Sequence, residues 1–332
     1  MQTYKIPSLF LLLLLFSMAV SAQTFDYALR YDGIGDNREF FSPYNQAETF
    51  LGSRLGFDVG TTIDSLHQFR VGLSYFYEYG SELLELKPQL IMYYSNQKGS
   101  WGFKMGAFPR KENTYYPYAF VSEKYEYFNP TVDGMLVTYQ KKNTNLNLLV
   151  DWVSRQDSTR REQFMAGIFG KQNPNSFIFE EYWYMFHSAG KIVRTPEEHI
   201  EDYMGGCFLF GYDFSSLVPL DILTIKTGAL ESSYRNRGVS MDYDVKISSY
   251  SEIVADYKGF GVEAFLKFGS EHKFMLGDQF FSNAKNYVRT RFYFTPINFK
   301  RVQGRFMWSL HIANGDMDNQ QQFRLVYKLS NY

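Results

Sequence analysis

The chain has 332 residues, and 34 Lys and Arg against 35 Asp and Glu give it a formal net charge of −1. This balance excludes nucleic-acid binding through bulk positive charge, and the single cysteine, Cys207, excludes an intramolecular disulfide framework. Aromatic residues make up 19% of the chain, yet after the first 22 residues no run approaches the roughly eighteen apolar residues of a transmembrane helix.

The first 22 residues have the pattern of a cleavable secretory signal. Lys5 provides a positive charge, Leu9–Val20 is apolar, and the small residues Ser21 and Ala22 precede Gln23. The apolar run is too short to span a bilayer as a helix, which disfavours the alternative of an uncleaved anchor. We therefore predict a signal peptide over residues 1–22 and a single exported domain over residues 23–332.

After the signal, apolar and polar residues alternate with a period of two. In residues 51–60, 67–80 and 302–313, one face is apolar with aromatic residues at its ends, and the other mixes Arg and Asp with Gly. Half-buried strands of soluble proteins also alternate. Charges on one face and aromatic ends on the other are, however, typical of strands that face lipid outside and water inside.

Sixteen segments follow this pattern. They cover residues 24–32, 49–61, 67–79, 85–95, 100–110, 131–141, 145–153, 161–171, 176–187, 203–213, 220–231, 247–257, 260–269, 287–297, 302–312 and 321–331. Short and longer connections alternate, and the expected longer ones are 33–48, 80–84, 111–130, 154–160, 188–202, 232–246, 270–286 and 313–320. This predicts an all-β, transmembrane, antiparallel up-and-down β-barrel with both termini on the periplasmic side. A barrel of fourteen or eighteen strands remains an alternative, because the ninth and tenth segments are less regular.

At this point the chain resembles porin-like outer-membrane β-barrels of the Bacteroidetes type. The local resemblance rests on the signal end Val20–Gln23, on Leu148–Trp152, and on Gly277–Phe281 before the strand with Arg289 and Arg291. It implies a bacterial outer-membrane location, short periplasmic turns and longer extracellular loops.

In a closed barrel the last strand lies beside the first, so inward-facing charges gather into two arcs. The predicted basic wall of the lumen contains Arg30, Arg54, Arg70, Lys87, Lys104, Arg289, Arg291, Arg305 and Arg324. The predicted acidic arc opposite contains Asp151, Glu252, Asp256 and Glu263. These charges either border open water and select polar solutes, with a mild preference for anions, or pair across neighbouring strands and stiffen the barrel.

The third long loop, Lys111–Pro130, carries too many aromatic residues for a water-exposed loop. Sixteen-stranded porins fold their third extracellular loop into the lumen, so the resemblance implies a constriction here; packing on the rim or on a neighbouring protein is the alternative. The candidate constriction residues are Glu112, Tyr115, Tyr116, Tyr118, Glu123 and Glu126.

Catalytic signals are weak in the sequence. The five histidines lack metal-ligand spacing, and the sole local acid–base group is Glu197, Glu198 and His199 near His187. We therefore expect no enzyme, no catalytic residues, no metal and no cofactor, with a hydrolase on the barrel rim as a distant alternative.

The leading functional hypothesis is a porin-like channel for passive diffusion of small hydrophilic solutes. The main alternative is a plugged structural or accessory barrel of a larger outer-membrane complex. The expected partners are outer-membrane lipid and small polar solutes, with self-association or other outer-membrane proteins as further alternatives, and no nucleic acid.

Overall fold

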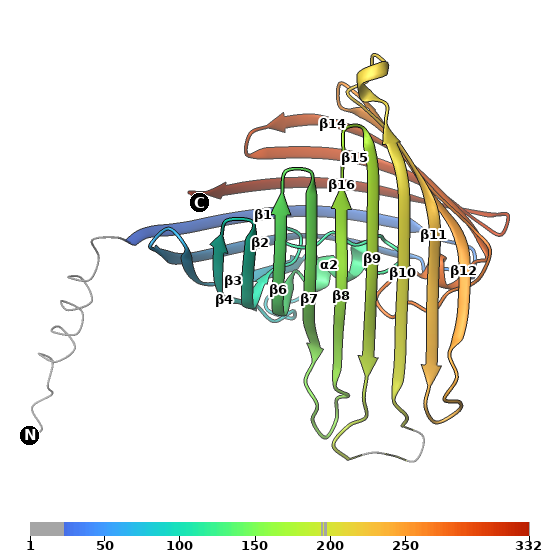
Figure 1. Ribbon diagram of the computed structural model, residues 1–332, viewed down its shortest axis with the longest axis horizontal. Coiled ribbons are helices and arrows are strands. Elements are labelled where there is room, and N and C mark those ends of the chain that lie inside the picture. Colours follow the sequence, from blue (N-terminus) through green and yellow to red (C-terminus); the bar gives the residue numbers. More distant parts are fainter. Residues whose placement is uncertain (1–22, 194, 196–197, 332) are drawn as a thin grey trace, which may run out of the picture.

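The computed structural model, described over residues 23–193, 195 and 198–331, is a closed antiparallel β-barrel of sixteen strands (Figure 1). Each strand pairs with its neighbours in the chain, and β1 closes the barrel against β16. The strands are β1 Gln23–Glu39, β2 Glu48–Ile63, β3 His67–Glu78, β4 Gln89–Lys98, β5 Trp101–Pro109, β6 Thr131–Lys141, β7 Thr144–Ser154, β8 Gln163–Gln172, β9 Phe177–Ser188, β10 Glu201–Asp213, β11 Ile222–Asn236, β12 Asp244–Tyr257, β13 Phe260–Phe268, β14 Asn286–Phe299, β15 Val302–Ala313 and β16 Asp316–Ser330. The predicted sixteen-stranded barrel is confirmed, whereas the predicted signal peptide lies outside the described residues.

The described residues include three short helices between the strands: α2 (Glu123–Phe128), η1 (Ser215–Leu217) and α3 (Gln279–Asn283). Among the residues that the structure describes, no helix is long and apolar enough to cross a membrane.

Alternation along each strand sends one set of side chains outward and the other into the lumen. On β2 and β15, Leu55 and Phe306 are 54% and 53% exposed on the outer face, whereas Asp58 and Ser309 are fully buried inside. Closure of the sheet pairs the backbone groups of neighbouring strands, which a lipid-exposed backbone requires.

Parts of two predicted loops belong to strands instead. Residues 33–39 continue β1, because they pair with β2 and β16. Residues 316–320 belong to β16, and a turn of Asn314 (φ 52°) and Gly315 (φ 106°) replaces the expected loop 313–320. Asn-Gly is a favoured two-residue hairpin turn because both positions need positive φ. The connections at this long-loop end are therefore less uniform than predicted.

We expect Arg to be tolerated on one face of β15 and not on the other. Phe306→Arg places a charge in lipid and should cost about 2–4 kcal/mol if it lies near the bilayer midplane. Met307→Arg, at the neighbouring position, points into the lumen beside Gln322 and should insert better. The measurement is the fraction of each variant that shows heat-modifiable migration in isolated outer membranes. Equal losses for both variants would contradict the assigned faces.

Candidate functional site

The loop after β5, here called the lumenal loop (residues 110–130), fills part of the barrel interior. Ala119 and Phe120 are fully buried, and Tyr127 is 4% exposed. Ser122 caps α2 by accepting a hydrogen bond from the backbone N–H of Tyr125 at 3.2 Å. The same serine's N–H donates to the carbonyl of Leu276 at 2.9 Å, so the lumenal loop packs on the second long inserted loop, residues 269–285.

Ion pairs fix the lumenal loop to the wall. Arg291 donates two hydrogen bonds to the Glu123 carboxylate, at 2.8 and 3.0 Å. Burial opposes ionisation of Glu123, yet Arg291 and Arg289 hold its pKa well below its usual range. Glu112 contacts Arg30 and also accepts a hydrogen bond from Lys328 at 2.9 Å.

The aromatic candidates of the lumenal loop lie against inward side chains. Tyr115 and Tyr116 pack on Phe169, with ring centroids 4.8 and 4.7 Å apart. Tyr118 lies under the guanidinium of Arg289, 4.3 Å from Cζ to the ring centroid. The loop occupies the place expected of a constriction.

Most side chains of the predicted basic wall point inward, but they already have ionic or hydrogen-bonding partners within the barrel. Arg324 binds Asp32 at 2.6 Å, and both Arg30 and Arg70 contact Asp58. The other wall residues on strands contact polar atoms or rings. Arg54 donates to the carbonyl of Tyr127, Lys104 to Asn113 at 2.5 Å and Arg305 to Thr295 at 3.0 Å, while Arg289 and Arg291 lie beside Tyr118. Lys87 was assigned wrongly, because it is exposed in the connection between β3 and β4.

The predicted acidic arc is also partly paired. Asp151 accepts a hydrogen bond from Arg110 at 2.7 Å, and Glu252 lies 2.5 Å from the ammonium of Lys226. Glu263 lies 3.8 Å from Arg291, and Asp256 accepts a hydrogen bond from the backbone N–H of Gly259 at 3.2 Å. Pairing of this kind weakens the transverse field that two unpaired arcs would produce.

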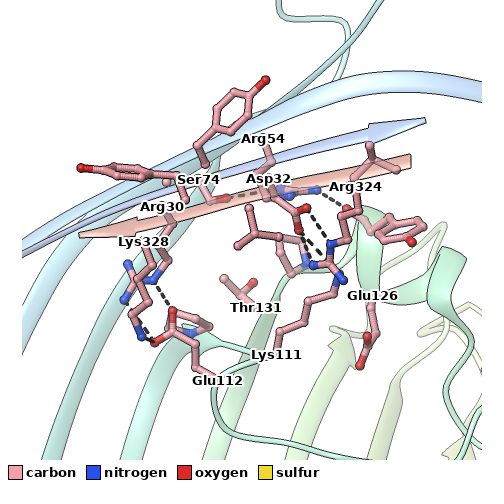
Figure 2. Close-up of a pocket in the computed structure, with 18 of the residues that line it drawn as sticks. Arg30, Asp32, Arg54, Ser74, Lys111, Glu112, Glu126, Thr131, Arg324 and Lys328 are labelled. Atoms are coloured by element: carbon pink, nitrogen blue, oxygen red, sulfur yellow. Dashed lines mark hydrogen bonds and ion pairs between the residues drawn. The ribbon is translucent and has the colours of Figure 1, made fainter. Parts of the chain in front are cut away.

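A charged cavity of about 190 Å³ remains between the lumenal loop and strands β1, β2 and β16 (Figure 2). Arg54, Asp32 and Arg324 line one side, and Lys111 and Glu126 of the lumenal loop line the other. Burial lowers the pKa of Lys111 to about 8 and raises that of Glu126. The cavity shares Lys111, Glu126 and Arg324 with a vestibule of about 690 Å³ beside the turn at residues 298–303.

Apolar side chains fill the lumen at the level of this loop. Beside the cavity, Ile34, Phe50, Phe76 and Tyr127 form one cluster, each no more than 4% exposed. A larger cluster joins the lumenal loop to the opposite strands. Its fully buried members include Phe108, Phe120, Leu149, Phe169, Phe186, Leu209, Leu230, Tyr250 and Phe280. At this level the described interior is therefore packed more densely than the predicted open channel would need to be.

A different group lies on the outer face, near the long-loop end. Five residues stand directly opposite one another on consecutive strands and form what we call the outer-wall row: Trp152 (β7), Phe164 (β8), His187 (β9), Asp202 (β10) and Arg235 (β11). Trp152 is 44% exposed on this face, and its ring stacks on that of Phe164 at 5.3 Å.

His187 is paired with a carboxylate in this row. Its Nδ1 lies 2.8 Å from Oδ1 of Asp202. Asp202 also accepts hydrogen bonds from Arg235 at 2.6 Å and Arg237 at 2.9 Å. A carboxylate on Nδ1 selects the tautomer that leaves Nε2 free as a proton acceptor. The arrangement therefore has the geometry of an oriented general base.

Sequence reasoning singled out His187 but named the wrong acids. Glu197 lies outside the described residues, and Glu198 pairs with Lys191 at 2.8 Å. The true partner, Asp202, is fifteen residues away and becomes adjacent through the β9–β10 register. An acid and a histidine on opposite arms of one predicted hairpin would have been the signal to look for.

Another histidine contacts hydroxyl groups but lies inside the barrel. His272 is 2.9 Å from Oγ of Ser232 and 2.8 Å from Oγ of Ser248, and all three are at most 3% exposed. Burial and the nearby Lys267 lower the pKa of His272 to about 3, so it is a weak base without access to lipid. Within the described residues, no group of three His, Cys, Asp or Glu is arranged to hold a metal ion.

We expect the Glu123–Arg291 pair to anchor the lumenal loop. Glu123→Ala leaves Arg291 buried without its carboxylate and should lower the free energy of unfolding by about 3–5 kcal/mol. Lys124→Ala is the control, because it removes a more exposed pair with Glu48 and should cost no more than about 1 kcal/mol. Urea unfolding in detergent, followed by tryptophan fluorescence, measures both. Similarly small losses of unfolding free energy in both variants would show that the buried Glu123–Arg291 pair does not anchor the loop.

Comparisons with known proteins give one family and one type of fold. The family described as Lipid A 3'-O-deacylase-type matches residues 20–332. A comparison with curated protein sequences found no significant match.

Solved outer-membrane proteins share the fold at low sequence identity. OpdK of Pseudomonas aeruginosa is 11% identical with a TM-score of 0.51, covering 92% of this chain and 99% of that one. OccK5 (OpdH) of the same organism is 8% identical with a TM-score of 0.56, covering 93% and 98%. OmpT of Vibrio cholerae is 10% identical with a TM-score of 0.56, covering 93% and 98%.

These similarities confirm the porin-like outer-membrane barrel. The family match contradicts the prediction that the protein is not an enzyme, because that family is one of deacylases. The prediction relied on acid–base residues that are close together in sequence, whereas β-sheet register also brings distant residues such as His187 and Asp202 together.

Proposed function

The chain belongs to the lipid A 3'-O-deacylase-type family, and we propose that it hydrolyses an acyl ester of lipid A at the outer-wall row. The observation that carries the proposal is the 2.8 Å contact between His187 and Asp202 on the lipid-facing side of the barrel. The polar head of an outer-leaflet lipid would meet the barrel near its long-loop end, which we place outside the cell. A base at this position can reach an ester without passage of the lipid into the packed lumen.

The chemistry needs a nucleophile and a proton acceptor. We assign the proton acceptor to Nε2 of His187 and the nucleophile to water. The water oxygen attacks the ester carbonyl carbon while its proton passes to His187, and the carbon–oxygen ester bond then breaks. The proton passes from His187 to the departing sugar oxygen, which leaves a free fatty acid and a sugar hydroxyl. Asp202 stabilises the transient imidazolium.

The surroundings of His187 suit an amphiphilic substrate. Trp152 and Phe164 provide an apolar surface on one side, and Arg235 and Arg237 provide positive charge on the other. Guanidinium groups bind phosphate strongly through charge-assisted hydrogen bonds. Acyl chains would thus lie toward β7 and β8, and the phosphorylated head toward β10 and β11.

We expect His187→Gln to lower the initial rate of fatty-acid release from lipid A vesicles by about 10²–10⁴-fold, the usual contribution of a general base. Asp202→Asn should also lower the rate, because it disturbs the tautomer of His187. The matched control is His67→Gln, which changes a histidine bound to Tyr94 at 2.7 Å on β3, near the short-turn end. An unchanged rate in correctly folded His187→Gln protein would refute the proposed base.

A second candidate is passive diffusion of small hydrophilic solutes with mild anion preference. It is supported by the charged residues that the cavity and the vestibule share, Lys111, Glu126, Arg324 and Lys328. The apolar clusters beside the lumenal loop argue against a wide pore, so hydrolysis remains the leading proposal.

If solutes pass by the lumenal loop, anion preference should fall as pH rises through about 8, because Lys111 loses its proton there. Planar-bilayer reversal potentials in a salt gradient, recorded from pH 6 to pH 10, measure this preference. Lys111→Arg is the control, because an arginine stays charged over this range. A pH-independent reversal potential, or no conductance at all, would count against this second candidate.

A further inference from the structure

Three cations share a single carboxylate in the charged cavity beside the lumenal loop. Asp32 of β1 is bound by Arg324 at 2.6 Å and lies 3.6 Å from the ammonium of Lys111. Arg54 stands directly opposite Asp32 in the β1–β2 pairing and is attracted by the same carboxylate. Figure 2 shows Asp32 turned toward Arg324, whereas Arg54 points to a hydroxyl group. The guanidinium of Arg54 is therefore the least compensated charge of the three.

The other charges of this cavity do not remove the excess. Its lining carries five cations and three carboxylates: Arg30, Arg54, Lys111, Arg324 and Lys328, against Asp32, Glu112 and Glu126. Behind the lining, Asp58 contacts Arg30, and Arg70, which also contacts Asp58, lies 3.9 Å from Asp26. Taken together, these groups leave at least one positive charge uncompensated. A charge away from bulk water is costly without a counter-ion, so the cavity favours an anion.

Arg54 has donors to offer such an anion. Its guanidinium donates to the hydroxyl of Ser74 at 3.3 Å and to the carbonyl of Tyr127, both neutral groups. These bonds use two of the five N–H donors of a guanidinium. Charge-assisted hydrogen bonds from a guanidinium to a carboxylate are short and strong. Arg54 is therefore suited to hold a carboxylate inside the cavity.

The size and the apolar part of the lining restrict the anion further. Ile34, Ile91 and Tyr127 line the cavity and are at most 4% exposed. The volume of about 190 Å³ equals that of on the order of six water molecules at roughly 30 Å³ each. This space fits a carboxylate with a chain of a few carbons and is too small for the acyl chain of a lipid. A dianion such as phosphate would waste the apolar wall.

The cavity communicates with the short-turn end of the barrel. It shares lining residues, among them Lys111 and Arg324, with the vestibule beside the turn at residues 298–303. Toward the long-loop end, Phe50 and Phe76 pack with Tyr127 in one buried cluster. We propose that the cavity binds a short-chain aliphatic monocarboxylate that enters from the short-turn side, with its carboxylate on Arg54. This binding requires neither hydrolysis on the outer face nor passage of the solute through the barrel.

The test is equilibrium dialysis of radiolabelled butyrate against the full chain in non-ionic detergent, with protein-free micelles as the blank. We expect one saturable site per chain. Arg54→Gln should weaken the affinity about ten- to hundredfold, the loss expected from one charge-assisted hydrogen bond. Lys111→Gln, on the lumenal loop, should weaken it in the same direction. The matched control is Arg305→Gln, which removes an inward arginine that donates to Thr295 at 3.0 Å outside the cavity lining and should leave the affinity unchanged.

Competing probes separate the outcomes. Butanol, inorganic phosphate and dodecanoate should displace labelled butyrate poorly, because they lack the charge, lack the apolar part or exceed the cavity. Displacement by any of them at the concentration at which unlabelled butyrate acts would overturn the proposed ligand class. Equal losses in Arg54→Gln and Arg305→Gln, or no saturable binding by folded wild-type protein, would overturn the site itself. Because no lipid A is present, the result does not depend on whether His187 acts as a base.

Discussion

The closed hydrogen-bonded ladder is the constraint on which the rest of this structure depends. In hydrocarbon, an unpaired backbone group is too costly, so the sheet must close on itself from β1 to β16. Closure in turn assigns each strand residue to lipid or to the lumen, with a strict period of two. Arg291 and Asp58 are therefore inside, whereas Phe306 and His187 are outside, whatever their individual preferences.

The lumenal loop is the main departure from this regular wall. By turning inward after Pro109, it brings Phe120 and Tyr127 into the lumen and buries Glu123 against Arg291. The interior is packed at the level of this loop, apart from the charged cavity and the vestibule.

Much of the fold follows from sequence because period-two alternation and turn residues are local signals. The sixteen strands and the inward direction of Arg54 and Arg324 could be predicted in this way. Strand ends were less predictable: residues 316–320 look polar enough for a loop, yet pairing across the Asn314–Gly315 turn keeps them in β16. The start of β4 was also misplaced: the strand begins at Gln89, two residues after Lys87, so Lys87 lies in the preceding connection and not in the wall.

The candidate site was harder to predict because it depends on register between strands. His187 and Asp202 come together only when β9 and β10 pair, and the intervening loop offers closer acids in sequence, such as Glu198. The pairing of Arg30 and Arg70 with Asp58 likewise depends on neighbouring strands, so a list of inward charges could not distinguish an open basic wall from a neutralised one.

The central claim is that this barrel acts on lipid from its outer face. The most direct measurement is the mass of lipid A recovered after incubation with the purified wild-type chain in vesicles. The account predicts a product lighter by one acyl group, together with an equal amount of free fatty acid. Intact lipid A after prolonged incubation with folded protein would contradict it.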